Sequence, residues 1–310
     1  MIARVLSLAA VSLISACSTL SPAPATSSGA ASARFCEQPE TYSALQQDRL
    51  FQFAEQVRRE LNAAGTDAAI ISRTGIDLQR LGIRFTHSGI AVKPDNPTGD
   101  TSWTIRQLYY ACDEARPRLY DQGIGGFLFG SDNPGIRHVS IVLPSPVNNK
   151  ALQQSARTNP LALRLLGARY SANAYPYSTA YQNCNQWVIE MLAVAWGRLS
   201  QSVNLRADAQ GWLRWRQYRP RPIELGSHWL KFAVMMSPMV RLDDHPEPQR
   251  DGLSFAVSLP RTIETFVRDH DARSKRIELC HNDKAIVIRH GWEPIAPGCQ
   301  PEMGDQVVPL

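Results

Sequence analysis

A cysteine at the expected start of a helix constrains the fold of this chain more than any other feature. Cys184 lies in residues 181–187, YQNCNQW, and the apolar residues that follow recur at helical spacing as far as residue 196. Far upstream, residues 84–93 alternate like a β-strand and carry His87. A helix N-terminus and a nearby imidazole both favour a thiolate. This order of elements predicts that folding brings a base to a nucleophilic thiol.

The N-terminal residues indicate export. Residues 1–16 place Arg4 before a short apolar run, which is the layout of a secretory signal and is too short to span a membrane. The run ends in LISAC, which resembles the lipobox of bacterial lipoproteins and implies that Cys17 becomes a lipidated N-terminus. An ordinary signal peptide with an incidental cysteine is the alternative. Residues 17–34, rich in Ser, Ala, Pro and Thr, are expected to form a flexible tether.

The expected location of the protein follows from this N-terminus. Ser18 comes directly after Cys17, which resembles the sorting pattern of lipoproteins of the outer membrane. We therefore expect the protein on the inner leaflet of the outer membrane, facing the periplasm, with the acyl chains on Cys17 as its contact with the membrane.

The cysteine count gives a second reason to single out Cys184. The chain has 6 cysteines, and removing Cys17 leaves five, an odd number for an oxidising compartment in which structural thiols pair. Connectivity does not follow from sequence. Our hypothesis leaves Cys184 free and makes two disulfides, Cys36 with Cys112 and Cys280 with Cys299.

Composition predicts a folded body and argues against several function classes. The chain is 44% hydrophobic and 20% charged, with a net charge of +5 and a pI of about 9.0. Its basic and aromatic stretch, residues 206–221, is better explained by an amphipathic helix than by nucleic-acid binding. The sequence holds no Gly-rich phosphate loop, no HExxH and no paired CxxC, so we expect no cofactor and no metal.

Hydrophobic periodicity and turn residues outline the remaining elements. An internal boundary is expected in the polar segment 243–252, which divides the chain into residues 35–243 and a C-terminal extension, residues 244–310. Helices are expected over 41–62, 119–129 and 149–167, and strands over 102–110, 138–143, 255–259 and 285–289.

Two motifs carry a resemblance to a known enzyme class. Residues 85–92, FTHSGIAV, resemble the histidine strand of NlpC-type papain-like enzymes. Residues 183–187, NCNQW, resemble the start of the cysteine helix in permuted members, which include relatives of lecithin retinol acyltransferase. The resemblance implies an α+β, permuted papain-like (NlpC-type) fold for residues 35–243. Its antiparallel sheet would pack on the cysteine helix, and residues 244–310 would add further helices and strands packed on this domain.

The mature chain also resembles a family of bacterial exported proteins known only as a domain of unknown function. The matching stretches are residues 86–92, 103–109, 132–134 and 174–190. This likeness is broad and implies no particular reaction.

The papain-like resemblance assigns catalytic roles. Cys184 would be the nucleophile and His87 the base, and a third polar side chain on the neighbouring strand would orient the imidazole. Gln107 is our choice for this third group, with Arg106 and His138 as the other candidates. A glutamine supplies no negative charge, so it stabilises an imidazolium less than an aspartate does.

An acyl-transfer intermediate also needs donors for its oxyanion. The backbone N–H of Cys184 is one by geometry, and Tyr181 or Gln182 would contribute another from just before the helix.

Together these features predict a thiol hydrolase or acyltransferase that acts on amide or ester bonds, with peptidoglycan peptides or acyl lipids as substrates. The second hypothesis is a papain-like module without turnover that binds the cell wall or envelope partners, and a structural lipoprotein of another fold is the third. Each residue also has a structural interpretation. Cys184 would then be a small core residue, and His87 a hydrogen-bonded strand residue.

Overall fold

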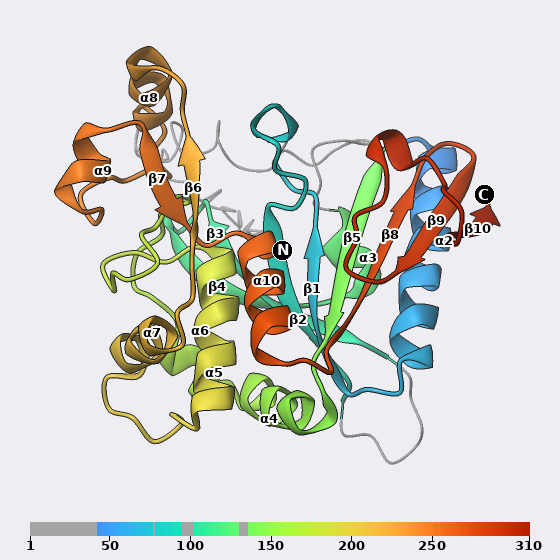
Figure 1. Cartoon of the computed structure of the whole chain (residues 1–310), viewed down its shortest axis with the longest axis horizontal. Helices are drawn as coiled ribbons and strands as arrows, with labels where there is room; N and C mark the ends of the chain where they lie inside the picture. Colours follow the sequence, from blue (N-terminus) through green and yellow to red (C-terminus); the bar gives the residue numbers. More distant parts are fainter. Residues whose placement is uncertain (1–41, 77, 95–101, 130–135) are drawn as a thin grey trace, which may run out of the picture.

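Eight antiparallel strands form one sheet through the middle of the molecule (Figure 1). The structure, a computed structural model, describes residues 42–76, 78–94, 102–129 and 136–310. The strand order is β10-β9-β8-β5-β1-β2-β3-β4, and every neighbouring pair is antiparallel. The strands are β1 (Ala68–Arg73), β2 (His87–Val92), β3 (Thr104–Ala111), β4 (Arg116–Gly123), β5 (Arg137–Leu143), β8 (Lys275–His281), β9 (Ala285–His290) and β10 (Gln306–Pro309).

The central strands β1, β2 and β5 are buried on both faces because helices cover both sides of the sheet. Successive side chains of a strand point to opposite faces, so Ile70 and Ile71 of β1 belong to two different hydrophobic cores. One core lies under the helices α4 (Pro146–Arg157), α5 (Asn159–Arg164), α6 (Cys184–Gly197), α7 (Leu205–Trp215) and α10 (Pro260–His270). The other lies under α2 (Ala44–Ala63) and α3 (Ile124–Phe129), on the far side of the sheet in Figure 1.

Several expected elements are confirmed. The expected helix 41–62 is α2, which begins with a capping box between Ser43 and Gln46. The expected cysteine helix is α6, and Trp187 of its apolar stripe is fully buried. The histidine strand is β2, and the expected strand 102–110 is β3, which pairs with it antiparallel.

Two expected helices are wrong in part. Residues 116–123 form β4, which pairs along its whole length with β3, and only 124–129 are helical. The expected helix 149–167 is two helices, because Pro160 has no N–H with which to continue α4 and instead lies in the first turn of α5.

The C-terminal residues complete the central sheet. Strands β8, β9 and β10 extend it from β5, so residues 275–310 supply strands of the same sheet as β1 and β2 rather than a layer packed on it. The Cys280–Cys299 disulfide is confirmed and ties β8 to the short helix η2 (Pro297–Cys299). Cys112 is also disulfide-bonded. Its expected partner, Cys36, lies outside the described residues, as do Cys17 and residues 132–134.

A smaller unit projects from the body at the upper left of Figure 1. It consists of the two-stranded sheet β6 (Arg221–Glu224) and β7 (Ser254–Val257) with the helices α8 (His228–Met235) and α9 (Glu247–Asp251). The short helix η1 (Gln79–Leu81) precedes β2. Within the described ranges, no helix has both the length and the apolar character needed to cross a membrane.

Candidate functional site

The N-terminus of α6 is fixed against the start of β2. Asn183 caps the helix by accepting a hydrogen bond from the backbone N–H of Gln186 at 2.7 Å, so Cys184 is the first helical residue. The side-chain amide of Asn185 donates to the carbonyl of Thr86 at 3.0 Å. The Cys184 thiol lies 4.0 Å from this same carbonyl oxygen and also faces the backbone N–H of Ser88. The thiol therefore contacts the chain on both sides of His87.

His87 and Gln107 are in direct contact. Gln107 Oε1 lies 2.7 Å from His87 Nε2. The amide nitrogen of Gln107 donates to Gln122 Oε1 at 2.7 Å, which turns its oxygen towards the imidazole. Nε2 of the ring is therefore the donor, and Nδ1 is left able to accept a proton.

Gly89 makes room for this contact. Its position on β2 lies against Ile105 and Gln107 of β3, and an added Cβ would stand 2.8 Å from the Ile105 side chain and 3.2 Å from Gln107 Cβ. Any larger residue would push β3 and Gln107 away from His87. The glycine thus positions the third group of the predicted triad.

Burial keeps both titratable groups neutral. The pKa of the Cys184 thiol rises to about 11 because it is buried. Burial, with the charge of Arg73, lowers the pKa of His87 to about 3, against a smaller raising effect of Gln107. The imidazole packs between the rings of Tyr109 and Phe127, at 4.8 and 5.9 Å between centroids. At neutral pH the pair therefore rests as thiol and imidazole rather than as an ion pair.

The structure brings His87 and Gln107 together but does not place the Cys184 thiol in contact with the His87 ring. No hydrogen bond joins the Cys184 thiol to the His87 ring in the described part of the chain. The ring and Gln107 face the core side that holds Phe127 of α3, whereas the thiol belongs to the core under α6. The ring and the thiol therefore lie on opposite faces of the sheet, and proton transfer between them requires a rearrangement of the chain at the start of β2.

The other candidates for the third group point elsewhere. Arg106 pairs with Asp121 at 2.6 Å and donates to the carbonyl of Ala156 at 2.7 Å. His138 faces Glu278 at 3.6 Å. Of the three side chains considered, Gln107 is the one in contact with His87.

The two expected oxyanion donors are directed away from the thiol. The Gln182 side-chain amide donates to the carbonyl of Leu165 and to the carboxylate of Glu190, and its backbone N–H donates to the carbonyl of Arg169. The Tyr181 hydroxyl bonds to Asp243 at 2.9 Å. The backbone N–H of Cys184 faces its own thiol and is the oxyanion donor that this geometry retains.

A buried polar network behind the thiol was missed from the sequence. Glu190 of α6 is fully buried, and its carboxylate accepts hydrogen bonds from Arg206 and from three glutamine side chains. Arg206 also donates to the carbonyls of Thr179 and Tyr181, which holds the chain before α6 in place. The glutamines are Gln182, Gln186 and Gln210. The spacing of four between Gln186 and Glu190 was the available signal, because it places them on one face of α6, whereas Gln182 lies before the helix.

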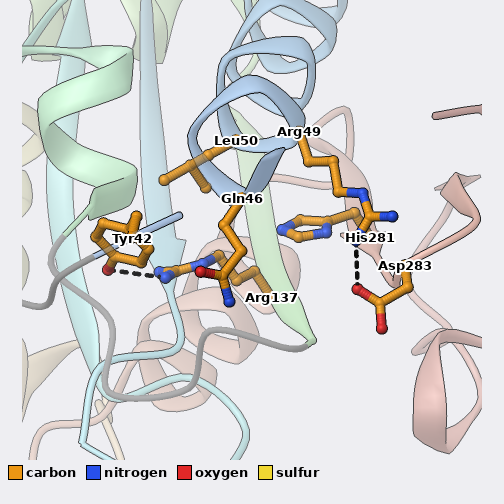
Figure 2. A pocket seen from close by; sticks show the side chains of 7 residues that line it. All are labelled: Tyr42, Gln46, Arg49, Leu50, Arg137, His281 and Asp283. Carbon is orange, nitrogen blue, oxygen red and sulfur yellow. Dashed lines mark hydrogen bonds and ion pairs between the residues drawn. The ribbon is translucent and has the colours of Figure 1, made fainter. Parts of the chain in front are cut away.

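A small cavity, separate from the thiol, lies beneath the N-terminal end of α2. Figure 2 shows Arg137 reaching the Tyr42 hydroxyl, at 2.9 Å, and Arg49 paired with Asp283 at 2.7 Å, with His281 between the two pairs. The cavity has about 10 Å³, which is room for about one water. It is too small to be a ligand site.

The raised pKa of the Cys184 thiol predicts how fast it is alkylated at each pH. With a pKa of about 11, only about one Cys184 thiol in a thousand is ionised at pH 8. We expect alkylation of the Cys184 peptide by iodoacetamide, followed by mass spectrometry, to rise about tenfold per pH unit up to about pH 10. The same chain unfolded in urea serves as control and should level off near the ordinary thiol pKa. A plateau below pH 8 in the folded protein would contradict this and indicate a thiolate paired with His87.

The fold and the site define a mixed α+β protein with a large antiparallel sheet and a free, buried cysteine at the start of a helix. Residues 60–267 match the family described as "Uncharacterized protein conserved in bacteria (DUF2145)", and the chain belongs to this family. The matched range runs from the end of α2 into α10 and includes His87, Gln107 and Cys184. Comparison with curated proteins and with solved structures finds no match.

Proposed function

We propose that this protein is a thiol hydrolase or acyltransferase of the bacterial cell envelope, anchored through lipidated Cys17. It would act on amide or ester bonds through an acyl-enzyme on Cys184. One observation carries the proposal: Gln107 orients His87 at 2.7 Å while the thiol lies against the backbone on either side of that histidine. The likeness of both motifs to permuted NlpC-type enzymes supports the same assignment, with peptidoglycan peptides or acyl lipids as the substrate classes.

The proposed reaction uses these groups in a fixed order. His87 Nδ1 takes the thiol proton as Cys184 Sγ attacks the carbonyl carbon, and the resulting oxyanion is met by the Cys184 N–H at the positive end of α6. The intermediate collapses with release of the amine or alcohol, which takes the proton from His87. Water, or an acceptor hydroxyl or amine, then attacks the thioester and regenerates the thiol. Substrate binding must first move His87, the first residue of β2, to the face of the sheet on which the thiol lies.

The second candidate is a papain-like module without turnover that binds the cell wall or envelope partners. Burial favours it, because the thiol and the imidazole are both neutral and are not hydrogen-bonded to each other. Nothing in this candidate requires Cys184 or His87 to react.

Acylation of Cys184 separates the two candidates. We expect incubation with a p-nitrophenyl ester to leave an acyl group on the Cys184 peptide, read by mass spectrometry, with release of p-nitrophenolate. The variant His87→Asn should slow acylation by roughly 10²–10⁴-fold, and Gln107→Ala should slow it less. His290→Asn, which changes a half-exposed histidine of β9, is the matched control and should react like the wild type.

Three outcomes decide between the candidates. Equal p-nitrophenolate release by Cys184→Ala and the wild type would reject the acyl-enzyme. Equal acylation in His87→Asn would show that the thiol reacts without this base. If purified sacculi retain Cys184→Ala and His87→Asn as well as the wild type and no acyl group forms, the binding module is the correct function.

A further inference from the structure

A cavity lies at the junction of the central sheet, α10 and the projecting unit. It has about 320 Å³, in the range of small-molecule sites. The chain just before β2, the start of β6, the start of α10 and the loop after β9 form its walls. Its lining residues are Gly82, Ile83, Arg84, Phe85, Arg221, Leu259, Arg261 and Pro294.

The polar part of this lining is entirely cationic. Arg84 is compensated, because it donates to the buried carboxylate of Glu278. Arg221 and Arg261 are exposed and have no hydrogen-bond or ion-pair partner within the described ranges. Glu264, one turn along α10, attracts Arg261 electrostatically, but its carboxylate is bonded to Arg276. Two arginines therefore line one cavity without a carboxylate of the described residues bonded to either of them, an arrangement that a bound oxyanion would stabilise.

The N-terminus of α10 adds positive electrostatic potential to this cavity. Leu259 and Arg261 flank the first residue of α10, so the N-terminus of this 11-residue helix forms part of the wall. The positive end of a helix favours negative charge in its first turn. The remaining wall is apolar and includes Ile83 and Phe85. A ligand that fits both parts has an anionic end and an apolar end.

We propose that this cavity binds a phosphate monoester that carries an apolar group. A dianionic phosphate matches the two arginines that have no carboxylate of the described chain bonded to them, and the apolar group lies against Ile83, Phe85 and Leu259. The site lies close to the thiol along the chain, since Phe85 precedes Thr86, whose carbonyl contacts Cys184. The proposal does not depend on catalysis by Cys184, because binding is measured without turnover.

The experiment is a calorimetric titration of the full chain with phenylphosphate. We expect Arg221→Gln and Arg261→Gln each to weaken binding about tenfold, and the double variant more strongly. Arg219→Gln is the matched control, because it removes an exposed arginine two residues away that does not line the cavity. Inorganic phosphate should bind more weakly than phenylphosphate. Dihexanoyl phosphatidic acid, tested alongside, distinguishes a lipid headgroup from a soluble ester as the natural source.

The outcomes are distinct from those of the proposed function. Binding of phenylphosphate to Cys184→Ala should equal that of the wild type, so loss of turnover leaves this test intact. Unchanged affinity in the double arginine variant overturns the proposal, as does an equal loss in Arg219→Gln, which would indicate attraction by net charge alone. Thermal unfolding of each variant checks folding, which the exposed positions should leave unchanged.

Discussion

Replacing Arg206 with methionine is expected to lower the free energy of unfolding by about 3–5 kcal/mol, the usual cost of leaving a buried charge without its partner. Glu190 is fully buried and Arg206 bonds to both of its carboxylate oxygens. The substitution also leaves the carbonyls of Thr179 and Tyr181 without their donor. Urea denaturation of the wild type and the variant measures the difference.

Two further variants test the cause of this loss. Arg59→Met removes an exposed arginine from its pair with Glu55 and should cost no more than about 1 kcal/mol. Adding Glu190→Gln to Arg206→Met should recover part of the stability, since no buried charge is then left unpaired. If Arg206→Met proves as mild as Arg59→Met, the network does not hold this part of the fold.

The second large effect is expected at Glu278, in the buried ionic cluster between the sheet and α10. Its carboxylate pairs with Arg84 and Arg276. Although burial raises the pKa of Glu278, contacts with His138 and the two arginines lower it to about 2. Glu278→Gln should therefore cost about 3 kcal/mol of unfolding free energy at pH 7.

The pH dependence of this cost has a defined sign. A carboxyl whose pKa is lowered by folding stabilises the protein above its unfolded pKa, near 4.5, and loses this contribution as the pH falls towards 2. The stability gap between wild type and Glu278→Gln should narrow over that window. Glu302→Gln, at an exposed partner of Arg289, is the control and should change stability by at most about 1 kcal/mol. A gap that stays constant between pH 5 and 3 contradicts the assignment.

Sequence reasoning succeeded where the signal is local. The cap residue Asn183 and the apolar stripe after it located α6, and alternation located β2. The choice of Gln107 as the partner of His87 also relied on local structure, because adjacent antiparallel strands bring such residues close together. The contact is present at 2.7 Å, while the catalytic role assigned to it stays a prediction.

The failures concern residues whose partners are distant. Strand β8 was missed because Arg276 and Glu278 look like surface residues, yet they are buried and paired beneath α10. Gln182 was expected beside the thiol, but the carboxylate of Glu190 draws its amide into the core.

Local signals in the sequence located the helix that begins at Cys184 and the strand that carries His87, because caps and periodicity act between near neighbours. The pairing of Cys280 with Cys299 was a hypothesis from the sequence, and the structure confirms it. Tertiary structure alone decided that β8 joins the sheet beside β5, that thiol and imidazole rest neutral, and that Arg221 and Arg261 share a cavity. These outcomes depend on burial and on contacts between segments far apart in the chain, which leave no periodic trace in the sequence.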